Sequence, residues 1–390
     1  MSNTVHLASR MGEIQPFHVM DLLARARQLE AQGRSIIHLE IGEPDFATAD
    51  SIIAAGHTAL ENKHTHYTPA LGLPVLRQTI ADYYQKRYDL HIDPRRIAIT
   101  PGASGALHLA LAVLINPGEQ VLMADPGYPC NRHFVRLLEG KSLGVPVTDN
   151  TAYQLTADLL QQYWSDSVVA AMVASPSNPT GTLVSRNQME SIVEFIDSKN
   201  AALLVDEIYQ GLVYEAEDYT ALSLTSDAFV INSFSKYFGM TGWRLGWLVV
   251  PEAYIDAVDR LAQNIFLAAP TLSQYAALEA FSDHTLQILD QRRDEFKRRR
   301  DFLYAALLDL GFKVPVKPQG AFYIYADCSR FTDDAYSFVY QMLEDVGVAV
   351  TPGIDFGTNR ATQHVRFAYT RSVDVLEQAA ERMSRFLKKQ

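Results

Sequence analysis

A lysine, two serines and an arginine stand close together in the sequence, in a combination that could hold both an aldehyde and a phosphate. Lys236 lies between two short apolar runs that predict buried strands, Ser233 and Ser235 flank it, and Arg244 follows it by eight positions. A buried ammonium is costly unless it is paired or chemically modified, and a desolvated lysine can form a Schiff base with an aldehyde. Hydroxyls and a guanidinium donate well to phosphate. The pattern favours a phosphate-bearing aldehyde cofactor over a buried turn whose lysine reaches solvent.

A carboxylate and two hydrogen-bond donors follow other apolar runs. Asp206 ends one of these runs, and Tyr209 comes three residues later. Asn178 lies in a loop that contains proline and glycine, after a further run. A buried aspartate needs a cation, and a protonated pyridine nitrogen would serve, while Asn178 and Tyr209 could donate to a ring phenolate. The alternatives are an aspartate that caps the next helix and an asparagine that serves only its turn.

Three further features carry weaker signals. Gly102, Ala103 and Ser104 link an apolar run to a helical pattern, where backbone N–H groups could bind phosphate, although no GxGxxG or P-loop motif is present. Tyr128 follows another strand end and could stack on a planar cofactor or lie in a turn. Arg366 lies in an alternating pattern, and it could grip a substrate carboxylate or pair with a carboxylate at the core edge.

Short apolar strands, separated mostly by helical patterns, must position these residues. This rhythm predicts a largely parallel sheet that is covered on both faces. Ligands bind beyond the carboxyl ends of the strands in such sheets, and most of the polar residues above follow a strand end. The predicted strands are residues 97–100, 121–124, 168–174, 201–205, 228–231 and 248–250.

Composition excludes several classes of function. The chain has 390 residues, of which 48% are hydrophobic and 20% charged, as in an ordinary soluble protein. Its net charge of −11 argues against nucleic acid and anionic membranes as partners. Two cysteines give no disulfide framework and no metal-ligand spacing, so we expect a cytoplasmic protein without a metal. The first residues lack the apolar core of a signal peptide, and no run is long enough to span a membrane.

The character of the chain changes toward its C-terminus. Residues 272–310 form a helical pattern without proline or glycine, which predicts one long helix, and an α+β pattern follows it. We expect the N-terminal segment to fold back on this C-terminal part, with a domain boundary inside the long helix. The predicted division is an N-terminal arm with part of a small domain at 1–47, a large cofactor-binding domain at 48–285, and a small C-terminal domain at 286–390.

Taken together, the order and spacing of these motifs resemble the class I/II aminotransferases, which are pyridoxal-5′-phosphate enzymes of fold type I. The resemblance covers nearly the whole chain, from about residue 16 to the end. It rests on Gly42, Tyr67, Gly102, Ala103, Ser104, Tyr128, Asn178, Asp206, Tyr209, Lys236 and Arg244 in this order.

The resemblance implies an α/β fold. Its large domain would hold a mostly parallel, seven-stranded type of sheet flanked by helices, and both termini would build a small α+β domain, as in aspartate aminotransferases. It also implies a homodimer with shared active sites, and a two-step ping-pong transfer of an amino group between an L-amino acid and a 2-oxo acid.

The resemblance further implies a role for each site residue. Lys236 would hold pyridoxal phosphate as a Schiff base and move the substrate proton, and Asp206 would pair with the pyridine nitrogen. Asn178 and Tyr209 would bond the phenolate, and Tyr128 would stack on the ring. Gly102, Ala103, Ser104, Ser233, Ser235 and Arg244 would seat the phosphate, Tyr67 would reach in from the partner subunit, and Gly42, Asn178 and Arg366 would bind the substrate.

The chain departs from the pattern of some relatives at one position, and two alternative functions remain open. Some aspartate-specific relatives carry a lysine in the loop occupied here by residues 102–105, and its absence makes aspartate doubtful as a substrate unless another cation serves. A carbon–sulfur β-lyase of the same fold would share every cofactor motif, and amino-group transfer against release of pyruvate and ammonia would separate the two. A non-catalytic cofactor-sensing module is disfavoured because no basic N-terminal extension is present.

Overall fold

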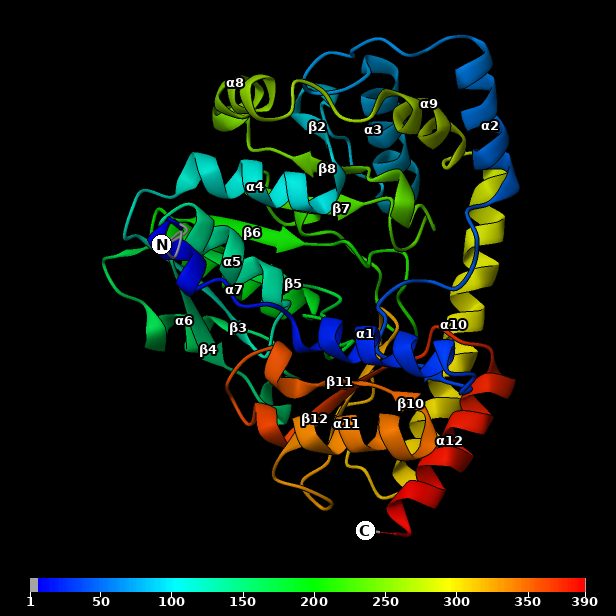
Figure 1. The fold of residues 1–390 in the computed structure, drawn as a ribbon. Coiled ribbons are helices and arrows are strands. Elements are labelled where there is room, and N and C mark those ends of the chain that lie inside the picture. Colours follow the sequence, from blue (N-terminus) through cyan, green and yellow to red (C-terminus); the bar gives the residue numbers. More distant parts are fainter. Residues whose placement is uncertain (1–5, 390) are drawn as a thin grey trace, which may run out of the picture.

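A seven-stranded sheet forms the centre of the computed structural model, which describes residues 6–389 (Figure 1). The strand order is β2-β8-β7-β6-β5-β3-β4, and β8 alone runs antiparallel to its neighbours. The prediction of a mostly parallel sheet is therefore confirmed. The strands are β2 (Ile97–Thr100), β3 (Gln120–Asp125), β4 (Lys141–Pro146), β5 (Val168–Ala174), β6 (Ala202–Asp206), β7 (Ala228–Ser233) and β8 (Gly246–Val249).

The strands are apolar on both sides because helices cover both faces of the sheet. Alternate residues of every strand except the edge strand β4 enter two separate hydrophobic cores, as Leu204 and Val205 of β6 do. One core holds residues of α4 (Gly102–Leu114), α5 (Pro129–Leu137) and α8 (Ile255–Ile265). The larger core holds residues of α2 (Asp50–Glu61), α3 (Pro74–Tyr88), α6 (Ala157–Tyr163), α7 (Arg186–Ser198) and α9 (Thr271–Glu279).

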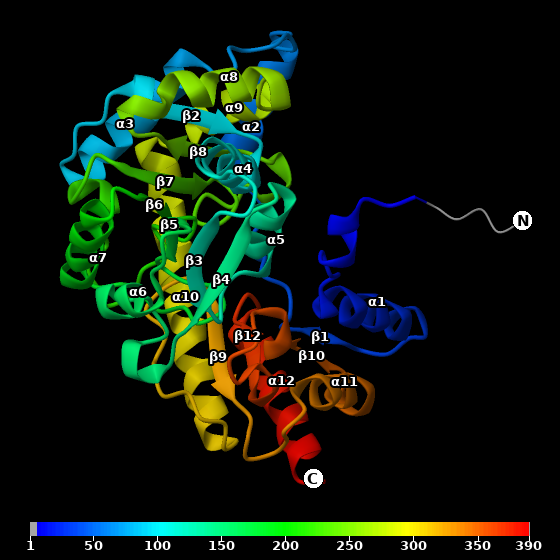
Figure 2. The same ribbon diagram turned by 90° about the vertical axis from the view of Figure 1, so that its left-hand side faces the viewer.

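The C-terminal part has its own small sheets, and the N-terminal segment joins them. β11 (Thr351–Pro352), β12 (His364–Ala368) and β9 (Tyr323–Asp327) form an antiparallel sheet in that order. β1 (Ile37–His38) pairs in parallel with β10 (Val348–Ala349), which confirms that the chain folds back on itself. Figure 2 shows α1 beside this part of the molecule. The accompanying helices are α1 (His18–Ala31), α10 (Asp283–Asp309), α11 (Ala335–Val346) and α12 (Val373–Leu387).

The prediction of one helix over residues 272–310 is wrong, because two helices, α9 and α10, occupy this range. The break lies at Ser282, whose hydroxyl accepts a hydrogen bond from the backbone N–H of Thr285 and so caps the start of α10. A serine N-cap starts a new helix without any proline or glycine, so the sequence pattern of residues 272–310 gives no sign of the break. The boundaries at residues 47 and 285 stay a prediction. Within residues 6–389, no helix combines the length and apolar character that crossing a bilayer requires.

Gly246 allows β8 to lie directly against the first turn of α4. A Cβ atom at this position would come within 2.8 Å of the backbone nitrogen of Ala103 and of the carbonyl oxygen of Asn232. Neither atom can move without shifting α4 or β7, so this contact fixes where the N-terminus of α4 meets the end of the sheet.

Gly246→Ala should therefore lower the free energy of unfolding by about 1–3 kcal/mol, the usual cost of overpacking. Gly242→Ala is a matched control, because it lies in the same segment and a Cβ there would meet no atom within 4 Å. Denaturant titration followed by circular dichroism measures both variants. Equal stability of the two variants would contradict this interpretation of the contact.

Candidate functional site

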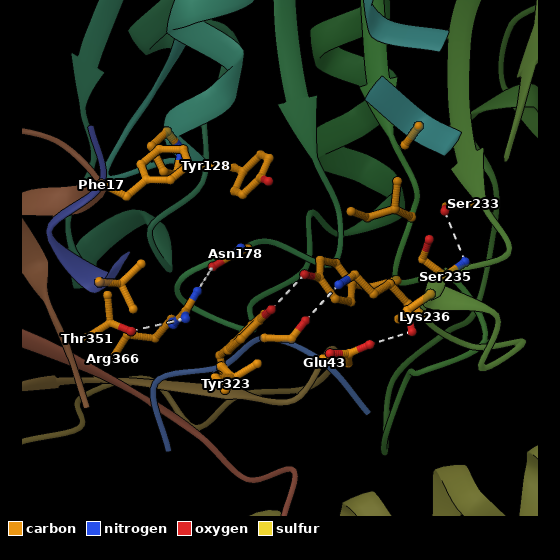
Figure 3. A pocket seen from close by; sticks show the side chains of 18 of the residues that line it. Phe17, Glu43, Tyr128, Asn178, Ser233, Ser235, Lys236, Tyr323, Thr351 and Arg366 are labelled. Carbon is orange, nitrogen blue, oxygen red and sulfur yellow. Dashed lines mark hydrogen bonds between the residues drawn. The ribbon is translucent and has the colours of Figure 1, made fainter. Parts of the chain in front are cut away.

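A cavity of about 510 Å³ opens at the carboxyl edge of the large sheet, where that sheet meets the C-terminal part (Figure 3). The parallel strands of the large sheet deliver their following residues to this edge, and β12 faces it from the small sheet. The predicted site residues that line the cavity are Gly42, Ala103, Ser104, Tyr128, Asn178, Asp206, Tyr209, Ser233, Ser235, Lys236, Arg244 and Arg366.

Lys236 follows β7, and its side chain enters the cavity. Its ammonium donates a hydrogen bond of 2.7 Å to the carbonyl oxygen of Gly42. Burial and, to a smaller extent, the positive charge of Arg366 lower the pKa of Lys236 to about 8, while the carboxylate of Glu43 opposes this shift. Near neutral pH the amine is thus much easier to deprotonate than an exposed lysine, as a nucleophile or a proton acceptor must be.

Asp206 lies at the end of β6 with only 4% of its surface exposed. Burial raises the pKa of Asp206 to about 6, while the N–H of Ile208, which donates to Oδ1 at 3.1 Å, and the charge of Lys236 oppose the increase. The described residues form no salt bridge with this carboxylate. A bound cation, such as a protonated pyridine nitrogen, would satisfy it.

Arg366 on β12 is held rigidly in the opposite wall. Nη1 donates to Oδ1 of Asn178 at 3.0 Å, and Nη2 donates to the carbonyl oxygen of Glu40 at 2.6 Å and to the hydroxyl of Thr351 at 3.1 Å. Its Nε is buried without a protein partner. Asn178 lies in the loop that follows β5 of the large sheet, so its contact with Arg366 joins this loop to the small sheet. An arginine fixed in this way can present a planar guanidinium edge to a carboxylate.

Tyr323, which the sequence did not single out, connects Arg366 with Tyr209. The hydroxyls of Tyr323 and Tyr209 lie 2.9 Å apart, and the Tyr323 ring centre lies 4.4 Å from the guanidinium carbon of Arg366. A Cβ atom at Gly42 would come within 2.2 Å of the Tyr323 hydroxyl. Gly42 therefore lets the N-terminal segment pass close to this pair of tyrosines.

The predicted phosphate seat forms at the N-terminus of α4. Residues 102–105 are the first turn of this helix and not a linking loop as predicted, so their free N–H groups lie at the helix start, where phosphate binds well. Arg244 has a left-handed backbone (φ 53°), and a Cβ at Gly102 would lie 2.8 Å from its Nη2. The Ser233 hydroxyl accepts from the N–H of Ser235 at 3.0 Å. Helix N–H groups, hydroxyls and a guanidinium thus meet in one place, and this donor set fits a phosphate.

Two predicted residues lie outside the cavity wall. Gly102 does not line the cavity, although a Cβ atom at this position would meet Arg244. Tyr67 is 81% exposed, and it does not line the cavity of its own chain. Tyr128 does line the cavity, and 37% of its surface is exposed, so its ring is available for stacking.

The N-terminal helix supplies a wall that sequence reasoning missed. Phe17 and three apolar residues of α1 (Val19, Met20 and Leu23) line the cavity. The carboxylate of Asp355 holds the start of this helix, because it accepts from the N–H groups of His18 at 2.8 Å and Val19 at 2.9 Å. The amphipathic pattern of residues 18–31 signals a docked helix, but it does not indicate the surface on which the helix docks.

Comparisons with known proteins agree with this geometry. The family model for aminotransferase class I and II matches residues 34–383. The chain is 38% identical to (5-formylfuran-3-yl)methyl phosphate transaminase of Methanocaldococcus jannaschii, over 98% of this chain and 100% of that protein. It is 37% identical to valine–pyruvate aminotransferase of Mycobacterium tuberculosis, over 99% and 100%. A crystal structure of an aminotransferase from Mycobacterium tuberculosis matches with a TM-score of 0.96 at 36% identity, over 99% and 100%.

The charges around Lys236 predict that two substitutions shift its pKa in opposite directions. Arg366→Gln should raise the pKa of Lys236, because it removes a cation that disfavours the ammonium, and Glu43→Gln should lower it. Competitive acetylation at a series of pH values, read by mass spectrometry of the Lys236 peptide, measures this in protein without cofactor. The exposed Lys141 serves as the internal control. Identical midpoints for Lys236 in the wild type and both variants would show that these charges do not act on it.

Proposed function

Because the chain belongs to the class I and II aminotransferases, which use pyridoxal phosphate, we propose that the cavity around Lys236 is where an amino acid and a 2-oxo acid exchange an amino group. One observation carries the assignment to this cavity. An amine of lowered pKa, a buried carboxylate without an ion-pair partner and a rigid arginine line one cavity. They are Lys236 in the turn after β7, Asp206 at the end of β6 and Arg366 on β12.

The residues present suit pyridoxal phosphate, and each end of the cavity would hold a different part of it. The phosphate would bind the first turn of α4 together with Ser233, Ser235 and Arg244, and Asp206 would pair with the ring nitrogen. Asn178 and Tyr209 would donate to the phenolate oxygen. When bound, the cofactor accepts the electrons left on the substrate Cα after its proton has been removed.

Lys236 would hold the cofactor through its amine. Once the amino group of the substrate has taken its place on the cofactor, the freed amine of Lys236 would take the proton from the substrate Cα and return it. A pKa of about 8 for Lys236 suits both steps, because a base works best when its pKa lies near the working pH. Arg366 would orient the substrate by its α-carboxylate, since Asn178, Glu40 and Thr351 fix the guanidinium in place. The helix α1 and Phe17 would exclude water from the bound substrate.

We propose a homodimer in which Tyr67 reaches the partner's cavity. The support is that this tyrosine is 81% exposed and lies outside its own cavity, although a tyrosine ring contributes most when it is buried in an interface. We place the protein in the cytoplasm because both cysteines, Cys130 and Cys328, are free thiols. The large domain would span residues 48–285, as the sequence predicts.

Borohydride reduction of the protein with pyridoxal phosphate should attach the cofactor to Lys236, because this is the amine that the site desolvates. Peptide mapping locates the label, and Lys236→Ala should abolish it, whereas the control Lys141→Ala should not. The wild type should also transfer amino groups from a panel of L-amino acids to 2-oxoglutarate or pyruvate. Label on another lysine would refute the assignment, and release of ammonia and pyruvate without transfer would indicate a lyase.

A further inference from the structure

Three arginines line the catalytic cavity and a second cavity beside it, and only two of them have a role in the proposed function. Arg244 and Arg366 line the catalytic cavity, where Arg244 would bind the phosphate and Arg366 the substrate carboxylate. Arg132 lines the second cavity, whose volume is about 240 Å³. Within residues 6–389, none of the three forms a salt bridge with a carboxylate. Arg244 and Arg366 each have an anionic ligand in the proposed function. Arg132 has none, so its ligand remains to be identified.

The second cavity adjoins the first. Both are lined by Tyr128, Ala174, Asn178 and Phe356, so the residues that would contact the ring and the substrate also bound the second cavity. Arg132 lies on α5, one helical turn beyond Tyr128, and its Nη2 donates to the carbonyl oxygen of Asp355 at 2.9 Å. The next residue, Phe356, has its ring centre 4.9 Å from the guanidinium carbon of Arg366. Arg132 is therefore connected to the wall that holds the substrate arginine.

The two carboxylates whose charges act on Arg132 are occupied by other donors. Asp125 accepts from the backbone N–H of Thr358 at 3.0 Å and from its hydroxyl at 2.9 Å. Asp355 binds the first N–H groups of α1. Arg132 is half-buried, and this burial lowers the pKa of Arg132 more than the charges of Asp125 and Asp355 raise it, while neither carboxylate forms an ion pair with Arg132. A cation in this situation is best satisfied by an anion that arrives with a ligand.

A second buried group in the same cavity also lacks a partner. Asn131 is 6% exposed, and its Oδ1 has no hydrogen-bond partner in the described chain. Rotating the amide by 180° exchanges its oxygen and nitrogen, so this side chain can present an N–H group to an anion beside Arg132. An unpaired amide in a buried position costs free energy, and a polar ligand would remove that cost.

We propose that Arg132 binds a second, distal anion of one substrate, a carboxylate or a phosphate, at the far end from the α-carboxylate held by Arg366. This inference rests on the proposed function and extends it to a substrate class: amino or oxo acids with an acidic side chain. Arg132 would also serve in place of the lysine that some aspartate-specific relatives carry in the segment corresponding to residues 102–105. Asn131 would assist as a neutral donor, and the residues shared by the two cavities would surround the chain that joins the two anionic groups.

The test compares donors that differ only in charge, namely aspartate with asparagine, glutamate with glutamine, and O-phosphoserine with serine. The preference of each pair is the kcat/KM of the charged donor divided by that of its neutral partner. Arg132→Gln should reduce this ratio by about 10-fold or more for at least one pair, and a 10-fold change equals about 1.4 kcal/mol. The kcat/KM for alanine, which reports the half-reaction with the donor and not the step with a dicarboxylate acceptor, should be unchanged within about twofold, since alanine has no second anion. The pair that changes most identifies carboxylate or phosphate as the anion. Arg132→Lys should restore part of the preference because it keeps the charge.

A binding measurement that needs no reaction separates this inference from the proposed function. Calorimetric titration with glutarate and with butyrate should show weaker glutarate binding in Arg132→Gln and no change for butyrate. Arg385→Gln, an exposed substitution on α12, is the matched control. Unchanged charge preferences together with unchanged glutarate binding would overturn the role of Arg132. Failure of every donor in the wild type would instead overturn the proposed function, and the glutarate titration would still test Arg132.

Discussion

The removal of charged groups from water at the carboxyl edge of one sheet is the constraint on which the rest of the structure depends. Burial raises the pKa of Asp206 from 3.8 to about 6 and lowers the pKa of Lys236 to about 8. Because the pKa of Asp206 is higher in the folded protein, the folded protein keeps this proton to a higher pH than the unfolded chain does. The free energy of unfolding therefore falls as pH rises from 3.8 to about 6, and this loss persists at neutral pH. A site that disfavours its own charges in this way is matched to a charged ligand.

The two halves of the molecule both contribute to that edge, and a short N-terminal segment links them. The carbonyl oxygen of Glu40 holds Arg366, the carbonyl oxygen of Gly42 holds Lys236, and the carboxylate of Glu43 accepts from Thr241 at 2.5 Å. The two backbone acceptors therefore orient the arginine and the lysine that would bind substrate and cofactor, and Glu43 ties the same segment to the loop that follows Lys236. Because this segment continues from β1, which pairs with β10, the C-terminal part can influence the lysine of the large sheet directly.

The sequence predicted the parallel sheet and most of the cavity wall, because carboxyl ends of parallel strands meet at one edge and Lys236 and Asp206 each follow such an end. It could not show contacts between residues far apart in the chain. Tyr323 was missed because its hydroxyl meets that of Tyr209 across 114 positions and between two sheets. Arg132 was missed for another reason, since only the structure shows that neighbouring carboxylates are already occupied. Periodicity gives the face of an element but not what lies opposite that face.

The most direct test of the central claim is the stability of Asp206→Asn, measured by denaturant titration with and without pyridoxal phosphate. Asparagine keeps the shape and the acceptor for Ile208 but removes the buried charge. Without cofactor, the variant should be at least as stable as the wild type, because the uncompensated carboxylate is gone. With saturating cofactor, it should gain less stability than the wild type, because the ring nitrogen has lost its partner. A variant that is destabilised without cofactor and gains as much from cofactor as the wild type would show that Asp206 serves the fold and not the ligand.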